Sequence, residues 1–224
     1  MKRMFVAGLI MLVADALAGA AAAADLGGRY PQQPYVKAPP YNPPFSWTGF
    51  YLGLNGGGGW GGSTWDRTGS FDLSGGVIGG TAGFNWQTGQ AVFGVEGDLD
   101  WSGMSGTTAT GCALGCTTRN DWLGTVRARA GFSFDRFLPY LTGGLAFGDI
   151  RASTPGFAGA SQTNLGWTIG AGMEAAIVGN WSAKAEFLHI DLGSFNCGLS
   201  CGPTVTDNVS LREELLRGGV NYRF

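Results

Sequence analysis

The sequence predicts an all-β fold, an eight-stranded antiparallel up-and-down barrel that crosses a membrane, and three observations support this. Apolar and polar residues alternate along most of the chain after Trp47, as they do in strands with two unlike faces. The connections between these strands alternate between short and long, which is typical of membrane barrels. Aromatic residues gather where the outward faces would cross the two membrane surfaces.

The composition excludes three other classes of protein. Only 13% of the 224 residues are charged and 12% are aromatic, which does not fit a disordered chain. The net charge of −2 and the lack of any block of Lys or Arg argue against nucleic acid as a partner. After the N-terminus no apolar run approaches about 18 residues, so a bundle of membrane-spanning helices is excluded.

Residues 1–24 have the features of a secretory signal peptide. A basic start, MKR, precedes an apolar stretch over 4–17 that only Asp15 interrupts, and a tail of small residues follows. This order of segments predicts export and cleavage before Asp25. The alternative is a membrane anchor, but the 14 residues of the apolar stretch are fewer than the roughly 20 that a spanning helix needs.

Residues 25–46 form a second zone, which we interpret as a periplasmic linker. Six of the nine prolines lie between Pro31 and Pro44. Such spacing denies regular backbone hydrogen bonding and favours extended polyproline segments. A semi-rigid linker fits this zone better than a ligand for a polyproline-binding domain. The remaining residues, 47–224, form the predicted barrel.

Eight stretches of the barrel region alternate with a period of two. The clearest is 90–102, where Phe93, Val95 and Leu99 share one face and Glu96 and Asp98 share the other. Alternation places successive side chains on opposite faces of a strand. The predicted strands are 47–60, 74–87, 90–102, 120–134, 137–150, 163–178, 181–193 and 209–224.

Alternation alone does not distinguish a soluble sandwich from a membrane barrel, because each has one apolar and one polar face. The lengths of the connections favour the barrel. They are tight after the second, fourth and sixth strands, and run for ten residues or more after the others, which predicts short periplasmic turns and long extracellular loops. The loops are predicted at 61–73, 103–119, 151–162 and 194–208, and these are candidate binding surfaces.

Aromatic residues on the outward faces also favour the barrel, since a sandwich predicts no aromatic belts. One girdle would lie at the rim of the short turns and the other at the rim of the long loops. The first comprises Trp86, Phe93, Phe134, Phe137, Trp181, Tyr222 and Phe224, and the second comprises Trp60, Trp101, Trp122, Phe147 and Trp167.

The polar faces of the strands would point into the barrel, whose eight strands enclose just enough space for side chains. Acids and bases are nearly balanced there, which suggests that they pair. We expect a plug of paired charges, and the alternative is a narrow conduit that selects ions by charge. The predicted lumen cluster is Glu96, Asp98, Arg127, Arg129, Glu174, Lys184, Glu186, Arg217 and Arg223.

The four cysteines form two local pairs, Cys112 with Cys116 and Cys197 with Cys201, each within a Gly-containing segment. Export to an oxidising compartment predicts disulfides, and the short spacing favours closure of each pair, although four cysteines allow three connectivities. A zinc site made from all four cysteines is the alternative, and it would require two distant segments to converge. We predict no metal and no cofactor.

Catalytic machinery is not predicted. His189 is the only histidine, Asp191 lies two residues on, and Ser194 or Ser210 could supply a nucleophile. Nothing in the sequence places a serine within hydrogen-bond reach of His189, which catalysis would require. The glycines of 56–59 are not a phosphate-binding loop, because no helix is predicted after them. We therefore expect no enzymatic activity.

Several segments resemble a known family, the small eight-stranded outer-membrane proteins of alphaproteobacteria, called porin-like or outer-membrane immunogenic proteins, which are similar to opacity-type surface antigens. The resemblance covers about 47–224, and His189 departs from it where an aromatic residue such as Tyr is expected. In the family, Tyr222 and Phe224 would serve as the signal for barrel assembly. The segments are WTGFYLGLNGGGGWGG (47–62), FGVEGDLDWSG (93–103), WSAKAEFLHIDLG (181–193) and VNYRF (220–224).

The resemblance implies a surface-exposed structural barrel in the cell outer membrane, with roles in envelope integrity, as a surface antigen or in adhesion. A narrow porin-like channel for ions or small solutes is the alternative function. The implied partners are outer-membrane lipid, lipopolysaccharide and the barrel-assembly machinery. Peptidoglycan and host surface molecules are further candidate partners of the linker and the loops.

Overall fold

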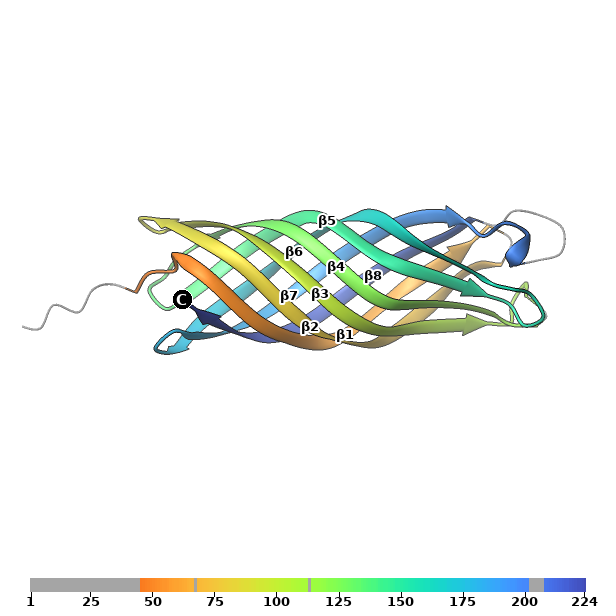
Figure 1. The fold of residues 1–224 in the computed structure, drawn as a ribbon, viewed down its shortest axis with the longest axis horizontal. Helices are drawn as coiled ribbons and strands as arrows, with labels where there is room; N and C mark the ends of the chain where they lie inside the picture. The colour runs from red at the N-terminus through yellow and green to blue at the C-terminus, as the bar shows by residue number, and fades with distance from the viewer. Residues whose placement is uncertain (1–44, 67, 113, 202–207) are drawn as a thin grey trace, which may run out of the picture. The chain divides into compact units, whose positions relative to one another are not determined.

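The computed structural model describes residues 45–66, 68–112, 114–201 and 208–224, and in it the chain forms a closed barrel of eight antiparallel strands (Figure 1). This confirms the predicted fold class. The predicted signal peptide and all but the last two residues of the predicted linker lie outside the described residues. The strands are β1 (Gly49–Trp65), β2 (Gly69–Thr88), β3 (Ala91–Thr108), β4 (Cys116–Phe132), β5 (Phe137–Ser153), β6 (Ala160–Val178), β7 (Trp181–Asn196) and β8 (Asn208–Arg223), with a single turn of 3₁₀ helix at η1 (Gly198–Ser200).

Each strand pairs with its neighbours in sequence, and β1 closes the barrel against β8. The closing register runs from Tyr51 opposite Arg223 to Trp65 opposite Val209. Gly57 lets the two strands approach, because a Cβ at this position would collide with the backbone of β8 at Leu216 and Arg217. No helix among the described residues is long and apolar enough to cross a membrane.

The connections at one end of the barrel, here called the turn end, are as tight as predicted. β2 and β3, and likewise β6 and β7, are joined by two residues. Gly89 and Gly179 adopt φ of +59° and +55° there, which favours glycine, and Asp135 does so with φ of +55° between β4 and β5. These tight turns fix the register of each hairpin.

The opposite end, the loop end, differs from the prediction. Only three residues (66–68) join β1 to β2, seven (109–115) join β3 to β4, and six (154–159) join β5 to β6. The predicted loops 61–73 and 103–119 are therefore mostly strand, 151–162 is half strand, and only the connection 197–207 is as long as expected. The strands run on because their inward side chains still have a core to enter.

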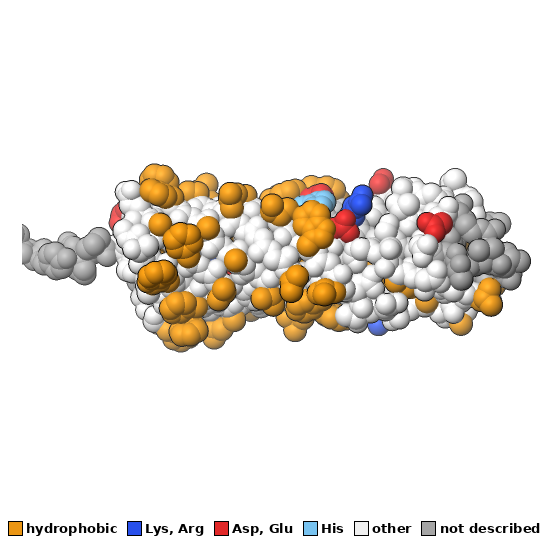
Figure 2. All heavy atoms as spheres, turned by 90° about the horizontal axis from the view of Figure 1, so that it is seen from above, with side chains coloured by type: hydrophobic (Ala, Val, Ile, Leu, Met, Phe, Trp, Pro, Cys, Tyr) orange, Lys and Arg blue, Asp and Glu red, His pale blue; other side chains and the backbone are white. Residues whose placement is uncertain are grey.

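The outward face of the barrel is apolar over the turn-end part and polar towards the loop end (Figure 2). We call the described residues of 61–76, 102–121, 148–164 and 189–214 the loop half, and the rest of the barrel the membrane half. β8 shows the change along one strand. Leu216 and Val220 face outwards in the membrane half, whereas Arg212 and Glu214 do so in the loop half.

The inward face changes in the opposite sense. In β7 the inward residues of the membrane half, Lys184 and Glu186, give way to Leu188, Ile190 and Leu192, all of them fully buried. The interior of the loop half is thus an ordinary hydrophobic core. This core continues across the border into the adjoining layer of the membrane half, where Leu123, Leu188 and Leu215 belong to it. Its larger members are Trp65, Leu73, Met104, Leu123, Ile150, Leu188, Ile190, Leu192, Phe195, Val209, Leu211 and Leu215.

Both ends of the lumen are closed by side chains. At the turn end, Trp47 is buried among apolar residues, and its indole Nε1 donates a hydrogen bond to the carbonyl of Asp135 at 3.2 Å. Trp47 precedes the first strand, because β1 begins at residue 49 and not at 47 as predicted. At the loop end the four cysteines form the local disulfides Cys112–Cys116 and Cys197–Cys201.

Candidate functional site

The charged cluster in the lumen is built from complementary positions on neighbouring strands. Glu96 of β3 lies opposite Arg127 of β4. Glu186 of β7 lies opposite Arg217 of β8. Because directly opposite residues on one face of an antiparallel pair have neighbouring Cβ atoms, the register alone brings acids beside bases.

Arg127 lies at the centre of the cluster. Its guanidinium contacts Glu96, Asp98 at 2.6 Å and Glu186 at 2.9 Å. None of these four side chains is more than 1% exposed. A guanidinium presents its donors in a rigid fork and is always charged, so Arg127 can bridge carboxylates from β3 and β7 across the lumen.

Arg217 bridges the same strands from the other side. Its Nη1 lies 2.6 Å from Asp100, and its Nη2 lies 2.9 Å from both Asp98 and Glu186. Asp98 and Glu186 are therefore each shared by two arginines. Such sharing compensates buried charge better than isolated pairs would, because these two carboxylates each meet more than one donor.

A second group of contacts lies beside this centre. Arg129 pairs with Glu174 at 2.8 Å, and its guanidinium lies 3.9 Å from the ring centroid of Tyr140. Lys184 Nζ lies 2.9 Å from Glu96. All of these groups are buried. The charged residues of the cluster come from five strands, β3, β4, β6, β7 and β8.

Neutral side chains complete the network. Tyr51 donates to Glu96 at 2.8 Å, and Tyr140 donates to Glu186 at 3.0 Å. Thr81 donates to Asp98 at 2.6 Å, and Asn221 donates to Glu174 at 2.9 Å. Sequence reasoning did not include these residues, although Tyr51 shares the inward parity of β1.

The cluster differs from the prediction in two members. Arg223 is only partly buried and lies over the rings of Phe45 and Trp47, at 4.4 and 5.6 Å from their centroids, so it belongs to the turn end. Asp100 takes part instead, through Arg217. The other eight predicted residues are together in the lumen. The ion pairs thus join five acids (Glu96, Asp98, Asp100, Glu174, Glu186) to four bases (Arg127, Arg129, Lys184, Arg217).

The aromatic residues of the predicted girdles lie on the outward face. At the turn end, Tyr222 packs edge-on against Trp181 and Phe224, with centroid distances of 5.1 and 5.2 Å. At the other girdle, Trp122 is partly covered by Phe147, at 6.2 Å. Four other tryptophans of the two girdles, Trp60, Trp86, Trp101 and Trp167, are at least half exposed, as side chains in contact with lipid would be.

His189 lies on the outward face and not in the lumen. Its Nδ1 is 2.6 Å from Glu214 Oε1, and its ring packs on Trp167 with a centroid distance of 5.2 Å. Ser194 lies opposite Ser210, and Asp191 pairs with Arg212 at 2.9 Å. His189 and Asp191 are thus each engaged with a residue of β8 at the edge of the apolar belt.

The hydrophobic core of the loop half is the part of the interior that sequence reasoning missed. One signal was present: Val209, Leu211 and Leu215 have the same parity as Arg217 in β8. In the membrane half this parity carries charges, so the alternation inverts along the strand. The predicted loop 194–208 lies directly before these residues, and the parity of β8 by itself predicts only a polar inward face.

Comparisons with known proteins agree with this architecture. Residues 10–224 match the family model described as "Outer membrane protein beta-barrel domain". The chain is 36% identical to the 31 kDa outer-membrane immunogenic protein of Brucella melitensis, over 96% of this chain and 98% of that one. It is 33% identical to the 25 kDa outer-membrane immunogenic protein of Brucella canis, over 96% and 97% of the two chains.

Two further proteins are similar to this chain. The chain is 38% identical to a 22 kDa outer membrane protein of Rhizobium leguminosarum bv. viciae, over 73% of this chain and 72% of that one. The crystal structure of Neisserial surface protein A has 19% identity and a TM-score of 0.48, and the match covers 79% of this chain and 98% of that one. The chain belongs to the outer-membrane β-barrel family whose members include the Brucella immunogenic proteins, and it is a surface-exposed barrel of the outer membrane.

Proposed function

We propose that this protein is a sealed structural barrel of the outer membrane that presents a rigid tip at the cell surface, as a surface antigen or in adhesion. The observation that carries the proposal is the filling of the lumen. Along the barrel axis it contains the Trp47 group, then the charge cluster, then the hydrophobic core of the loop half. An eight-stranded barrel is narrow enough for side chains to fill completely.

The energetic cost of opening this path supports a non-conducting barrel. A passing ion would have to separate Arg127 from three carboxylates. It would then have to cross a core in which Leu188, Ile190 and Leu192 are fully buried. Removing one partner of a buried ion pair costs about 3–5 kcal/mol, and an apolar core offers an ion no replacement for its water.

The tip supports the surface role. The two disulfide rings have the same size, and each carries a leucine at its centre, Leu114 and Leu199, which are 61% and 67% exposed. Thr154 joins the rings, since its hydroxyl lies 3.6 Å from Cys116 Sγ and donates to the carbonyl of Cys201 at 3.2 Å. A rigid surface loses little conformational entropy when it binds a partner.

Conductance across a planar lipid bilayer tests the sealed lumen. We expect no resolvable channel from the refolded chain 25–224, whose folding is checked by heat-modifiable migration on a gel. The double variant Arg127→Ala/Arg129→Ala should unfold more easily and, where inserted, leak irregularly. Stable ion-selective steps from the parent chain that change in the double variant would instead establish the narrow porin.

Chemical modification of introduced lysines tests whether the loop end is exposed on the cell surface. Leu114→Lys should be modified on intact cells by an amine reagent that does not cross membranes, because it lies at the loop end. The matched variant Gln90→Lys, in the turn between β2 and β3, should be modified only after the cells are broken. The opposite result would place the loop end in the periplasm and contradict the surface role.

A further inference from the structure

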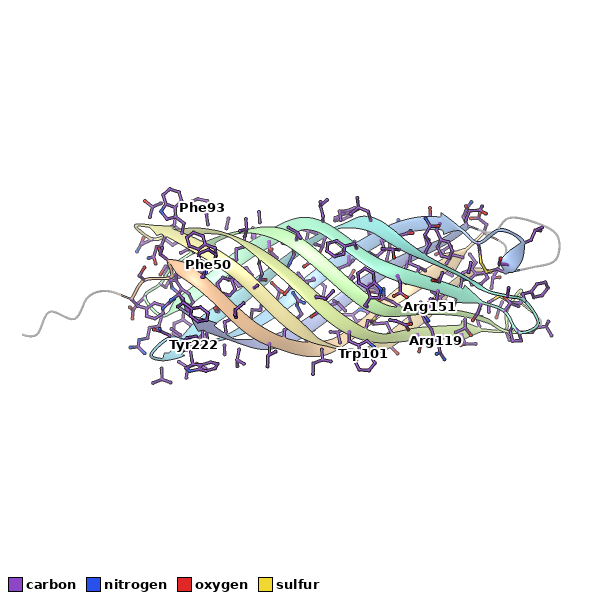
Figure 3. The ribbon with its side chains drawn as sticks, viewed as in Figure 1. Phe50, Phe93, Trp101, Arg119, Arg151 and Tyr222 are labelled. Carbon is purple, nitrogen blue, oxygen red and sulfur yellow. A yellow bond between two sulfur atoms is a disulfide. The ribbon has the colours of Figure 1, made fainter. Side chains whose placement is uncertain are left out.

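Two arginines lie side by side on the outward face of the loop half. Arg119 of β4 is directly opposite Arg151 of β5, and both side chains are exposed. Figure 3 places both on the loop-end side of Trp101. Like charges on directly opposite residues destabilise a strand pair, so this position favours the binding of an anion between them.

The carboxylates nearby are already occupied. Asp149 accepts hydrogen bonds from the backbone N–H groups of Asp121 and Trp122, at 2.9 and 3.1 Å, and from Arg151 Nε at 3.0 Å. Asp121 lies 3.0 Å from Arg151 Nη1. These contacts hold the Arg151 side chain in place and leave its Nη2 without a partner among the described residues.

Arg119 has no such compensation. Within the described part of the chain, no carboxylate lies within ion-pair distance of its guanidinium. The site therefore combines one oriented and neutralised arginine with one uncompensated arginine. Because Arg151 pairs with two carboxylates, Asp121 and Asp149, the four charged groups together carry no net charge. Arg119 contributes the positive charge that has no ion-pair partner among the described residues, and Arg151 contributes a fixed fork, which together suit the oxygens of a phosphate group.

A groove of about 460 Å³ runs beside the two arginines. Its wall includes the hydroxyl-bearing residues Thr117, Ser153 and Ser161. Ser161 lies opposite Arg151, and Thr117 lies opposite Ser153, so one hydroxyl is beside Arg151 on β6 and two lie beyond the arginines towards the loop end. A volume of this size exceeds that of a bare phosphate and falls in the range of sites for small ligands. Hydroxyls in such positions are able to bind the hydroxyls of a sugar.

The height of the groove relative to the membrane identifies the source of the ligand. Arg119 lies three residues before the girdle residue Trp122 in β4. With about 3.3 Å per residue and a tilt of about 40°, this places it about 8 Å outside the edge of the hydrocarbon. The headgroup layer is about 5–8 Å thick on each side of a bilayer, so the groove lies at the level of lipid headgroups.

We propose that Arg119 and Arg151 bind the phosphate of a phosphorylated sugar in the headgroup of an outer-leaflet glycolipid. The groove takes the sugar, and the acyl chains lie along the apolar outward face below Trp122. The binding anchors one side of the barrel to the leaflet that surrounds it. This inference rests on the position of the barrel in the membrane and does not depend on a sealed lumen.

Native mass spectrometry of the full mature chain in detergent, titrated with bisphosphorylated lipid A, tests the proposal. We expect Arg119→Gln to raise the apparent Kd roughly tenfold, the loss expected from one charge-assisted contact. Arg151→Lys keeps the charge but loses the fork, so its effect should be smaller. Dephosphorylated lipid A should bind the parent chain as weakly as bisphosphorylated lipid A binds Arg119→Gln.

The matched control is Arg212→Gln, which removes another exposed outward arginine, from β8, where Arg212 pairs with Asp191. It should leave the Kd unchanged. Equal losses in Arg212→Gln and Arg119→Gln, or no loss in Arg119→Gln, would overturn the site. Binding of glucose 1-phosphate as tight as that of lipid A would overturn the lipid source and identify a site for soluble phosphosugars. A failure of the sealed-lumen proposal would appear in conductance and leave these affinities unaltered.

Discussion

The two halves of this barrel are opposite in the way they place polar and apolar side chains. In the membrane half the outward face is apolar and the inward face carries ions, whereas in the loop half the outward face is polar and the inward face is a hydrophobic core. One strand, β8, shows both arrangements, with Arg217 and Leu211 on the same inward face. Each face matches the medium that it meets, and neither is intrinsically the inside of a protein.

The comparison also separates two ways of filling a barrel. The membrane half is filled by ion pairs, whose contribution to the free energy of unfolding depends on every partner being present. The loop half is filled by close-packed hydrocarbon, which loses stability in proportion to the volume removed. Substitutions at matched positions should therefore have different effects in the two halves.

The largest effect is expected from Arg127→Ala, because it leaves Glu96, Asp98 and Glu186 buried with fewer partners. We expect a loss of about 3–5 kcal/mol in the free energy of unfolding, measured by urea titration in lipid vesicles. The exposed ion pair of Arg212 with Asp191 provides the control, since Arg212→Ala should cost about 1 kcal/mol or less. Similar losses in the two variants would mean that water enters the charge cluster.

Leu215→Ala and Leu216→Ala form a second comparison, on adjacent residues of β8. Leu215 is fully buried in the core, whereas Leu216 faces lipid. Both lose about 1.5–3 kcal/mol of transfer free energy, but only Leu215→Ala also leaves a cavity, which brings its loss to about 2–5 kcal/mol. The difference is measured by the same urea titration. Equal losses would show that the interior relaxes or is hydrated.

Arginines introduced on the outward face of β1 map the edge of the membrane. Leu54 and Thr64 have the same outward parity, and Leu54 lies within the apolar belt. Leu54→Arg should lower the stability by about 2–4 kcal/mol, whereas Thr64→Arg should change it by about 0.5 kcal/mol or less. A large loss for Thr64→Arg would place the loop half inside the bilayer and remove the distinction between the halves.

The smallest effect, and a stabilising one, is expected at Glu213. Its side chain is buried in the loop half, and neither carboxylate oxygen has a hydrogen-bond partner among the described residues. Glu213→Leu should raise the free energy of unfolding by about 1 kcal/mol, because it replaces an uncompensated polar group with a packed apolar one. Destabilisation in this variant would reveal a polar partner for Glu213, such as bound water.

The strand pattern and the membrane half could be predicted because their signals are local. Glu96 and Arg127 alternate with apolar residues along their strands, and parity assigns both to the lumen. Parity alone, however, does not tell which residues on one face of a strand contact one another. Asp100 and Arg223 both have inward parity, but only the three-dimensional position places Asp100 beside Arg217 and Arg223 over Trp47.

The loop half was mistaken for loops because its strands look polar. Residues such as Gly62, Ser63 and Thr64 are typical of turns, and the single aromatic Trp65 gives little sign of a core. The core becomes visible only when Trp65, Leu73 and Leu211 come together from three strands. Such contacts between strands that are distant in sequence are not encoded in any one segment.

The inverted loop half also has a kinetic consequence. To reach its final position, each hairpin end must cross the hydrocarbon while it carries groups such as Arg119, Arg151 and Arg212, which remain exposed in the folded barrel. Each arginine costs about 2–4 kcal/mol at the bilayer midplane. The same side chains that end in water therefore raise the barrier to spontaneous insertion, and they equally oppose slippage of the finished barrel back through the membrane.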